Sequence, residues 1–593
     1  MLPYKAIQQR LQAAVKLVLP DADTSSVLVQ PCPDPKFGDY QSNALMALAK
    51  ARKINPRQLA TDVVARLDLA DICDKVDVAG AGFLNFRLSP SAVAQTLESA
   101  LTGGTLFYEK TSTPKTVVVD FSSPNVAKPM HVGHIRSTVL GDALARVLRL
   151  LGHRVVTDNH IGDWGTQFGM LLVGWKTVLD AAALKADPLK EMERIYKLIS
   201  GRCDPDKPGF DPETLDRARA ELVKLQAGEP ENLEIWKEMI RLSQAQFETI
   251  YGRLRVKFDY TLGESFYNSR LAAVVSELME AGVAVESRGA KAVLSNGGLP
   301  PKEDPFLIQK EGEWVANPFI VQKQDGGFNY ATTDLATLAY RLETWQADEV
   351  IYVTDGRQQL HFRQLFAAFQ RWHPEVKTKL AHVWFGSILG EDGKPFKTRS
   401  GETVRLSDLL DEAEQRALQV VSDKSPDLPE PARREIARVV GIGAVKYADL
   451  LPNRQSDYVF SWEKLLALNG NTAPYLQYAF ARIRSIFRKG GLEGTTGMPA
   501  KGLQISEPQE RALARHLFNF GLTLEGVAQE YRPNFLCNYL YELAGHFTTF
   551  YEKCPVLKAE ADVRATRLVL CDLTAQVLRE GLTILGIETL EQM

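Results

Sequence analysis

Residues 120–134 read D-F-S-S-P-N-V-A-K-P-M-H-V-G-H, and this stretch decides the fold of the chain. It starts at the end of the apolar run V-V-V-D at 117–120, which is typical of a buried parallel strand. A proline-containing loop follows, and His131 and His134 then open a helix-periodic stretch that ends at Gly152. Nucleotide-binding sheets use this order of strand, loop and helix N-terminus, because free N–H groups and the helix dipole favour anions there. The stretch therefore predicts an α/β domain with a nucleotide site.

The loop follows neither of the two common phosphate-binding designs, because it is not a P-loop and lacks G-x-G-x-x-G. His131 and His134 stand three residues apart on the first helical turn and therefore face the same way. Gly133 between them allows a flat base to approach the backbone. We interpret the stretch as an ATP site of an unusual kind, with Gly133 close to the nucleotide.

The bulk properties of the chain set broad limits. At 593 residues it is too long for one core, and usual domain sizes predict about four units. Its 70 lysines and arginines against 73 aspartates and glutamates give a formal charge of −3, so no bulk basic charge indicates nucleic acid. Local patches rather than net charge set phosphate contacts, so RNA binding is not excluded.

Cysteine usage and hydropathy indicate the compartment. The six cysteines form no C-x-x-C pair and no metal-ligand spacing, which favours free thiols in a reducing environment. The N-terminus lacks a signal-peptide pattern, and no apolar run approaches membrane-spanning length. The sequence therefore predicts a cytoplasmic protein with no protein-bound metal site.

The pattern of helices and strands changes several times along the chain. Residues 1–105 mix amphipathic helices with short strands, as in a small α+β module. Residues 106–404 alternate strand and helix, as in a Rossmann-type parallel-sheet domain, and charged helices at about 176–300 indicate an inserted connective domain. Residues 405–455 are read as a helical connector and residues 456–593 as an all-helical domain. The predicted fold class is α/β, flanked by an N-terminal α+β module and a C-terminal helical domain.

The histidine pair matches the H-x-G-H signature of class I aminoacyl-tRNA synthetases, and four segments together resemble arginyl-tRNA synthetases of the bacterial type. They are S-S-P-N-V-A-K-P-M-H-V-G-H-I-R-S-T at 122–138, G-D-W-G-T-Q-F-G at 162–169, N-T-A-P-Y-L-Q-Y-A at 471–479 and L-T-I-L-G-I-E at 582–588. H-x-G-H alone is a weak signal, since any helix N-terminus can carry two histidines. The four segments, however, extend the resemblance over nearly the whole chain.

The resemblance implies an arginine–tRNA ligase that uses ATP with Mg²⁺. It implies formation of an arginyl-adenylate, transfer of arginine to the 3′-terminal adenosine of tRNA(Arg), and release of AMP and pyrophosphate. Activation is then expected to wait for tRNA. The N-terminal module and the helical domain are expected to bind tRNA, the latter at the anticodon.

Activation is the attack of a carboxylate on the α-phosphate of ATP. The protein must position the two groups and offset the charge that grows on the phosphoryl oxygens and the departing pyrophosphate. Such a step needs hydrogen-bond donors rather than a general base, and His131 and His134 at a helix N-terminus can donate into the phosphate chain. The resemblance implies that both are catalytic.

The family also has a second, mobile phosphate-binding loop similar to K-M-S-K-S. The candidate here is G-K-P-F-K-T-R-S-G at 393–401, which departs from that consensus. Lys397 and Arg399 are its candidate phosphate ligands, although arginine and lysine differ in geometry. The resemblance implies that Lys128 supplies the missing ammonium. From its own sequence, the loop could equally be a solvated turn.

Arginine as a substrate requires acids and carbonyls, because its guanidinium is planar and always charged. Tyr330 and Asp334 are spaced i and i+4 and share one helical face. The local sequence leaves open that Asp334 is an N-cap or a surface acid. By resemblance, the arginine-binding residues are Asp120, Ser122, Asn125, Tyr330, Asp334 and Gln358.

The segment at 162–169 follows the next expected strand. Its glycines permit close approach of a ribose or a base. Gly162, Asp163 and Gln167 are candidate ATP-binding residues, and a purely structural turn is almost as well supported.

Two regions are candidates for RNA contacts. The expected helix at 474–489 combines aromatic residues with Arg482, Arg484 and Arg488, which suits unpaired bases and phosphates but also suits a plain basic helix face. In A-G-F-L-N-F at 81–86, alternation along a strand places Phe83 and Asn85 on one face. By resemblance, these two grip a base of the tRNA D-loop, while an ordinary core strand is the alternative.

Two other functions fit the sequence less well. A class I synthetase for cysteine, glutamate or glutamine would need cysteine and histidine metal ligands or a basic pocket, which the sequence does not offer. A tRNA-binding protein that has lost catalysis would be expected to lack the ATP-site histidines. The expected partners are thus tRNA(Arg) and L-arginine, with no DNA and no membrane, and a monomer is the expected state.

Overall fold

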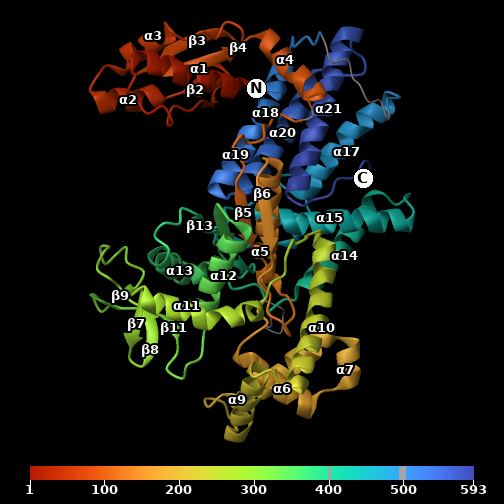
Figure 1. The fold of residues 1–593 in the computed structure, drawn as a ribbon. Coiled ribbons are helices and arrows are strands. Elements are labelled where there is room, and N and C mark those ends of the chain that lie inside the picture. Colours follow the sequence, from red (N-terminus) through yellow and green to blue (C-terminus); the bar gives the residue numbers. More distant parts are fainter. Residues whose placement is uncertain (104, 398–402, 493–501) are drawn as a thin grey trace. The chain divides into compact units, whose positions relative to one another are not determined.

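The structure, a computed structural model, describes residues 1–103, 105–397, 403–492 and 502–593. The chain forms two compact units, one of Met1–Thr111 with Ala467–Met593 and one of Ser112–Leu466 (Figure 1). The histidine stretch lies in the second unit.

A four-stranded parallel sheet lies at the centre of Ser112–Leu466. Its strands, in sheet order, are β13 (Lys379–His382), β12 (Glu349–Tyr352), β5 (Thr116–Asp120) and β6 (Arg154–Asp158). Val118 lies opposite Val350, and both are fully buried, as is typical of parallel strands with helices on both faces. The chain order reverses between β5 and β12, where sheets of this class bind ligands at the carboxyl ends of their strands.

Helices connect and cover these strands (Figure 1). They are α5 (Val132–Leu150), which joins β5 to β6, and α11 (Asn268–Glu280), α12 (Tyr330–Trp345) and α13 (Gln359–Trp372). One buried apolar cluster contains residues of β5, β12 and the last three helices. The predicted parallel α/β fold is confirmed.

Residues between β6 and β12 form two further substructures. The first is helical: α6 (Thr166–Val178), α7 (Ala181–Ala186), α8 (Pro188–Cys203), α9 (Pro212–Gln226) and α10 (Pro230–Leu254). Three of these helices begin with proline after an acidic N-cap, at Asp187, Asp211 and Glu229, because proline's fixed φ suits the first turn and an acid accepts the free N–H groups.

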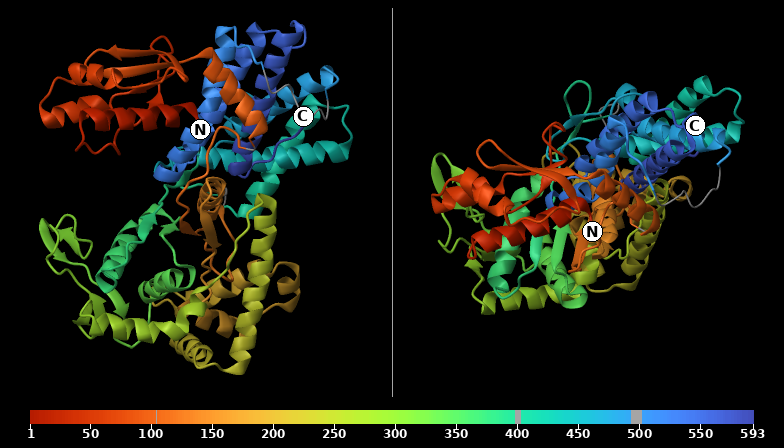
Figure 2. Two further views of the ribbon diagram at one scale, coloured as in Figure 1. Left: turned by 45° about the horizontal axis from the view of Figure 1, so that its top comes forward. Right: turned by 90° about the horizontal axis from the view of Figure 1, so that it is seen from above.

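The second substructure contains, before residue 300, a hairpin that was not predicted, since the sequence suggested charged helices at about 176–300. The 3₁₀ turn η1 (Glu264–Tyr267) precedes α11, and an antiparallel sheet follows. Its elements are β7 (Ala284–Ser287), β8 (Ala290–Val293) and β11 (Phe319–Gln322), with a separate hairpin of β9 (Leu307–Lys310) and β10 (Glu313–Ala316). This small sheet lies away from α6 to α9 in both Figure 1 and Figure 2.

The rest of this unit is mainly helical. It contains η2 (Gly356–Gln358), β14 (Ile388–Leu389), α14 (Leu406–Lys424), α15 (Glu430–Leu450), β15 (Tyr458–Val459) and α16 (Trp462–Leu465). A Cβ on Gly441 would lie 2.7 Å from the carbonyl oxygen of Ala413, so glycine permits the close crossing of α14 and α15. The short strands β14 and β15 pair in parallel.

The other unit begins with the predicted α+β module. Its four-stranded antiparallel sheet has the order β1-β2-β4-β3, and the last helix starts at a Ser89 N-cap. The elements are α1 (Pro3–Val18), β1 (Gln30–Pro31), β2 (Tyr40–Ser42), α2 (Ala44–Arg52), α3 (Pro56–Val64), β3 (Cys73–Ala79), β4 (Phe83–Leu88) and α4 (Pro90–Thr102).

The C-terminal part of this unit is helical, as predicted. It consists of α17 (Ala473–Lys489), α18 (Pro508–Phe518), α19 (Phe520–Glu530), α20 (Asn534–Lys553) and α21 (Ala561–Ile584). A Cβ on Gly581 would lie 2.5 Å from Leu540, so α20 and α21 approach closely there. Among the described residues, no helix combines the length and apolar character needed to cross a membrane.

Candidate active site

His131 is the N-cap residue of α5, and His134 follows within the first turn. Nδ1 of His134 accepts a hydrogen bond from the His131 backbone N–H at 3.1 Å, and Nδ1 of His131 accepts one from the Gly133 N–H at 3.1 Å. The ring centroids lie 4.1 Å apart. A neutral imidazole that accepts at Nδ1 carries its proton on Nε2. Both side chains therefore offer an Nε2–H donor to a ligand.

The environment keeps both imidazoles neutral. Burial, with a smaller contribution from His131, lowers the pKa of His134 to about 3. Burial and the charge of Arg357 lower the pKa of His131. A Cβ on Gly133 would lie 2.8 Å from the His131 ring, so glycine leaves room for this arrangement. The pair can donate hydrogen bonds at neutral pH without carrying charge.

The segment between β5 and α5 is strained. Three non-glycine residues have positive φ: Ser122 at 75°, Ser123 at 48° and Ala127 at 61°. The Ser122 N–H donates to Ser137 Oγ at 2.8 Å, and the Ala127 N–H donates to Ser243 Oγ at 3.0 Å. Strain that neighbouring contacts hold in place is typical of ligand-binding backbone.

Three basic residues were predicted to bind phosphate. Lys128 lies in the strained segment, with its ammonium 4.6 Å from the centre of the Tyr196 ring in α8, a cation–π contact. Lys397 is exposed and forms an isolated antiparallel bridge with Thr403. Arg399 lies outside the described residues.

The basic segment 393–401 is followed by residues that return to the histidines. The Val132 N–H donates to the Val404 carbonyl at 3.0 Å, and the Leu406 N–H donates to the Met130 carbonyl at 2.9 Å. These two bonds flank His131 in the chain. Residues 404–406, which follow the basic segment, are thereby fastened to the start of α5.

Tyr330 and Asp334 lie in the first turns of α12, beside His361 of α13. The N-cap is Asn329, so Asp334 is not a capping residue. Oδ2 of Asp334 lies 2.6 Å from Nε2 of His361, and the rings of Tyr330 and His361 are 4.9 Å apart. Tyr330 is 65% exposed and is available to a ligand. His361 thus orients one carboxylate oxygen of Asp334.

Sequence reasoning missed two residues here, His361 and Glu264. Burial, aided by the charges of Asp334 and Asp163, raises the pKa of Glu264 to about 7. A second carboxyl group therefore lies within electrostatic range of Asp334, and the two repel each other. A bound cation would relieve that repulsion. The i+4 spacing pointed to Asp334, but nothing local in the sequence pointed to Glu264.

Asp120 has partners other than those expected. It is 4% exposed, its Oδ2 accepts from Arg341 at 2.7 Å, and its Oδ1 accepts from the Ser123 hydroxyl at 3.0 Å. Arg341, fully buried on α12, also donates to Asp158 at 2.8 Å. This buried triad ties the carboxyl ends of β5 and β6 to the helix that carries Asp334.

The other predicted arginine ligands differ in their accessibility. Ser122 is buried, and its hydroxyl bonds to Tyr251 at 2.8 Å and accepts from Thr138 at 2.9 Å. Asn125 and Gln358 are exposed, in the strained segment and in η2. Asn125 and Gln358 are therefore open to a ligand, whereas the Ser122 side chain already has protein partners.

The predicted ATP-binding turn lies beside the strained segment. A Cβ on Gly162 would lie 2.4 Å from the Asn125 side-chain oxygen, so this close approach requires glycine. Asp163 is buried and accepts from the Ser265 N–H at 2.8 Å and its hydroxyl at 2.6 Å. Gln167 is half-buried in the first turn of α6. Asp163 therefore holds η1 in place, while Gly162 lets the turn lie close to Asn125.

The three arginines of α17 face the end of the chain and α20. Arg484 Nε lies 2.9 Å from a carboxylate oxygen of Glu591, and Arg488 donates to the Glu591 carbonyl at 2.8 Å. The Arg482 guanidinium is 5.2 Å from the centre of the Tyr551 ring. Phosphate contacts by Arg484 and Arg488 would compete with Glu591.

Phe83 and Asn85 share one face of β4. Leu84, Phe86 and Leu88 on the opposite face are buried in the core of the N-terminal module. Phe83 is half-buried, and Asn85, at 6% exposure, lies between Gln41 and Asp77 of the neighbouring strands. The alternation expected from the sequence is present, although Asn85 is more covered than Phe83.

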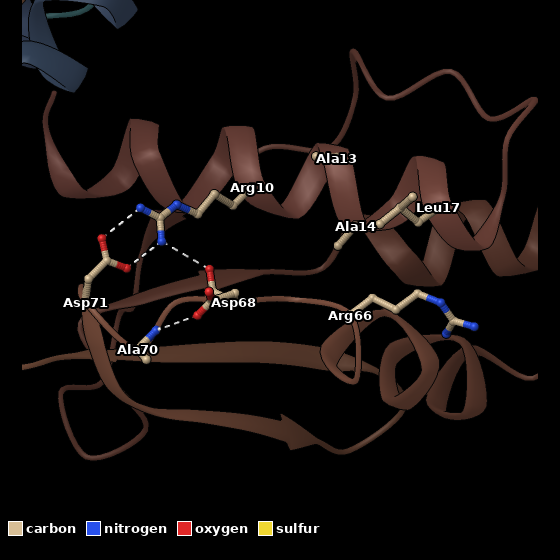
Figure 3. A pocket seen from close by; sticks show the side chains of 8 residues that line it. All are labelled: Arg10, Ala13, Ala14, Leu17, Arg66, Asp68, Ala70 and Asp71. Carbon is tan, nitrogen blue, oxygen red and sulfur yellow. Dashed lines mark hydrogen bonds and ion pairs between the residues drawn. The ribbon is translucent and has the colours of Figure 1, made fainter.

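A pocket of about 560 Å³ lies elsewhere, in the N-terminal module (Figure 3). Arg10 forms a two-pronged ion pair with Asp71, at 2.5 and 2.8 Å, and donates to the Asp68 carbonyl at 3.1 Å. Its charge is therefore already satisfied. Among the described residues, no group of three or more His, Cys, Asp and Glu side chains is arranged to hold a metal ion.

Three protein-family models match successive parts of the chain. Residues 96–462 match the family described as tRNA synthetases class I (R), catalytic domain. Residues 5–88 match the arginyl tRNA synthetase N terminal domain, and residues 476–593 match the DALR anticodon binding domain.

A curated relative and two solved structures match this chain over nearly their full length. The arginine–tRNA ligase of Chromobacterium violaceum is 46% identical, with 100% of both chains covered. The arginyl-tRNA synthetase structure from Thermus thermophilus has a TM-score of 0.83 at 26% identity, with both chains fully covered. That from Plasmodium falciparum has a TM-score of 0.81 at 28% identity, covering 100% of this chain and 99% of that one. The chain belongs to the class I arginyl-tRNA synthetases.

Proposed function

We propose that the chain ligates L-arginine to tRNA(Arg) in two steps at this site. ATP and arginine first form arginyl-adenylate and pyrophosphate, and arginine then passes to the 3′-terminal adenosine with release of AMP. The observation that carries the proposal is the pair of neutral imidazoles, with Nε2–H donors on one helix N-terminus. Preformed donors of this kind offset charge that develops on phosphoryl oxygens without reorganising.

Arginine is proposed to bind between α12 and η1. Asp334, oriented by His361, would accept from the guanidinium, and the Tyr330 hydroxyl would add a polar contact. Glu264 would ionise fully once the positive guanidinium lies beside it. Asn125 and Gln358 would hold the amino and carboxylate groups. A site of charged hydrogen bonds rejects other amino acids strongly without editing.

ATP is proposed to lie across the start of α5. His131 and His134 would donate to the phosphate chain, and Lys128, Lys397 and Arg399 would neutralise the leaving pyrophosphate. Gly133, Gly162 and Gln167 would form the floor under the nucleoside. Mg²⁺ fits as an ion that arrives with ATP, since it commonly takes phosphate and water oxygens as ligands, and it would supply charge neutralisation when bound.

The tRNA is proposed to contact both flanking domains. Residues 456–593 would bind the anticodon through α17, and residues 1–105 would bind the tRNA D-loop through Phe83 and Asn85. We further propose that activation depends on tRNA, that the enzyme is a cytoplasmic monomer, and that neither DNA nor a membrane is a partner. The boundaries 106–404 for the catalytic domain and 405–455 for the connector belong to this proposal.

An aminoacylation assay tests the function. Unfractionated tRNA, ATP and each of the twenty radiolabelled amino acids are incubated with the protein, and acid-precipitable label is counted. Only arginine should become attached. Attachment of another amino acid would contradict the pocket assignment, and attachment of none, with tRNA still bound, would favour the tRNA-binding protein that lacks catalysis.

A further inference from the structure

Arg136 follows His134 by two residues on α5 and has no role in the steps above. It is 1% exposed and is among the largest fully buried side chains of the protein. A buried guanidinium is costly unless its charge and its N–H groups are satisfied. Its partners therefore indicate what it does.

Those partners come from two distant segments. One terminal nitrogen, Nη1, donates to the Gly386 carbonyl at 2.8 Å and to the Ser456 carbonyl at 3.2 Å. Nε lies 3.1 Å from Oδ1 of Asp449, which is itself fully buried. The guanidinium also lies 5.1 Å from the centre of the Tyr458 ring. Arg136 thus joins α5 to residues 386 and 449–458 at once.

Gly386 is the entrance to the basic segment. The chain passes from it into β14, and Phe396 returns to donate to the Ile388 carbonyl at 3.0 Å, while its ring lies 4.8 Å from that of Phe460. A Cβ on Gly386 would lie 2.8 Å from the Asp457 backbone nitrogen, so the entrance is closely packed. A shift at Gly386 would therefore move Lys397.

Described residues before and after the basic segment bond to α5. Val404 accepts from the Val132 N–H, and Gly386 accepts from Arg136. We propose that Arg136 is a positioning residue, which sets the entrance of the 390–397 loop relative to His131 and His134 so that both groups engage the same triphosphate. This inference rests on the proposed function of that loop.

The guanidinium suits this task better than an ammonium. Its fixed planar fork presents Nε to Asp449 and Nη1 to the two carbonyls in one geometry. Lysine can still neutralise Asp449, but it cannot hold all three partners. Arg136→Lys therefore keeps the positive charge beside Asp449 but loses the contacts that position the loop. Arg136→Met would instead leave Asp449 unpaired and risk unfolding.

The test compares Arg136→Lys with Arg149→Lys, a control on the same helix whose guanidinium pairs with Asp259 at 2.6 Å. Arg136→Lys should raise the Kd and the KM for ATP about tenfold and leave the KM for arginine within about twofold, with the Tm close to wild type. It should also speed tryptic cleavage at Lys397. Arg149→Lys should match wild type in all these measurements.

An ATP Kd like that of wild type, or equal increases in both KM values together with a lowered Tm, would overturn the inference. The ATP Kd is measured by equilibrium dialysis and does not depend on ligation. A wild-type protein that attaches no arginine to tRNA would therefore count against the proposed function alone, while the Kd comparison still decides the role of Arg136.

Discussion

Nδ1 of His134 accepts the backbone N–H of His131, and this single hydrogen bond fixes what the second histidine can do. With Nδ1 occupied and the pKa lowered to about 3, the imidazole is neutral and its only proton is on Nε2. The residue is then a fixed donor and cannot act as a base that shuttles a proton at Nδ1. Its partner His131 is held in the same way by Gly133.

The first prediction concerns that donor. His134→Ala should lower the rate of arginyl-adenylate formation by roughly 10²–10³-fold, because one preformed donor to the transition state is lost. His134→Gln, whose amide nitrogen can lie near the position of Nε2, should recover part of the rate. Rapid-quench measurement of adenylate formation gives both values.

The affinity for tRNA serves as the control for this pair of variants. It should stay close to wild type, because the histidine acts on the transition state of activation. A parallel loss of tRNA binding in His134→Ala and no recovery in His134→Gln would show that the residue supports the helix rather than the chemistry.

The second prediction concerns Asp334. Asp334→Ala should weaken arginine binding by about 2–5 kcal/mol, since a desolvated guanidinium loses its charged partner. The KM for arginine is measured in the aminoacylation assay, with ATP saturating. The matched control is Glu343→Ala, on the same helix α12, where the acid pairs with Arg270 at 2.9 Å at the surface. An arginine KM that is equal in both variants would remove Asp334 from the pocket.

The third prediction concerns pH. The pKa of Glu264 is raised to about 7 by burial and by neighbouring acids, so the group gains its negative charge as the pH rises through neutrality. Arginine stays positively charged throughout, and its affinity should therefore increase between pH 6 and 8.5, with proton release on binding. In Glu264→Gln the KM for arginine should be higher and nearly independent of pH. A wild-type KM that does not vary with pH would place Glu264 outside the pocket.

The fourth prediction separates structure from binding at Asp120. Both of its oxygens accept from protein groups, Arg341 and Ser123. Asp120→Asn should therefore lower the free energy of unfolding by about 3 kcal/mol, because a buried guanidinium loses one of two carboxylates. The KM for arginine should change little. Urea unfolding and steady-state kinetics measure the two effects, and a raised KM at unchanged stability would return Asp120 to the arginine pocket.

The sequence predicts those parts of the site whose signals are local. The valines at 117–119 and the periodic helix after His131 place the histidines on a helix N-terminus at the edge of a parallel sheet. The spacing of Tyr330 and Asp334 places them on one face of α12. In each case neighbouring residues carry the whole pattern.

Partners from distant segments could not be predicted in this way. Arg341 meets Asp120 across 221 residues, and His361 meets Asp334 across 27, although neither shares a periodic pattern with its partner. The hairpin of β7 and β8 was missed inside a helical reading, although Arg288 and Gly289, both with positive φ, form its turn.

ATP–pyrophosphate exchange with each amino acid, with and without tRNA(Arg), is the decisive experiment for arginine activation at the histidine pair. We expect exchange with arginine alone among the amino acids, only when tRNA(Arg) is present, and reduced by roughly 10²–10³-fold in His134→Ala. Exchange with arginine in the absence of tRNA would support the ligase activity but contradict the proposed dependence of activation on tRNA. Exchange that His134→Ala leaves unchanged would contradict the role of His134, and exchange with another amino acid would contradict arginine as the substrate.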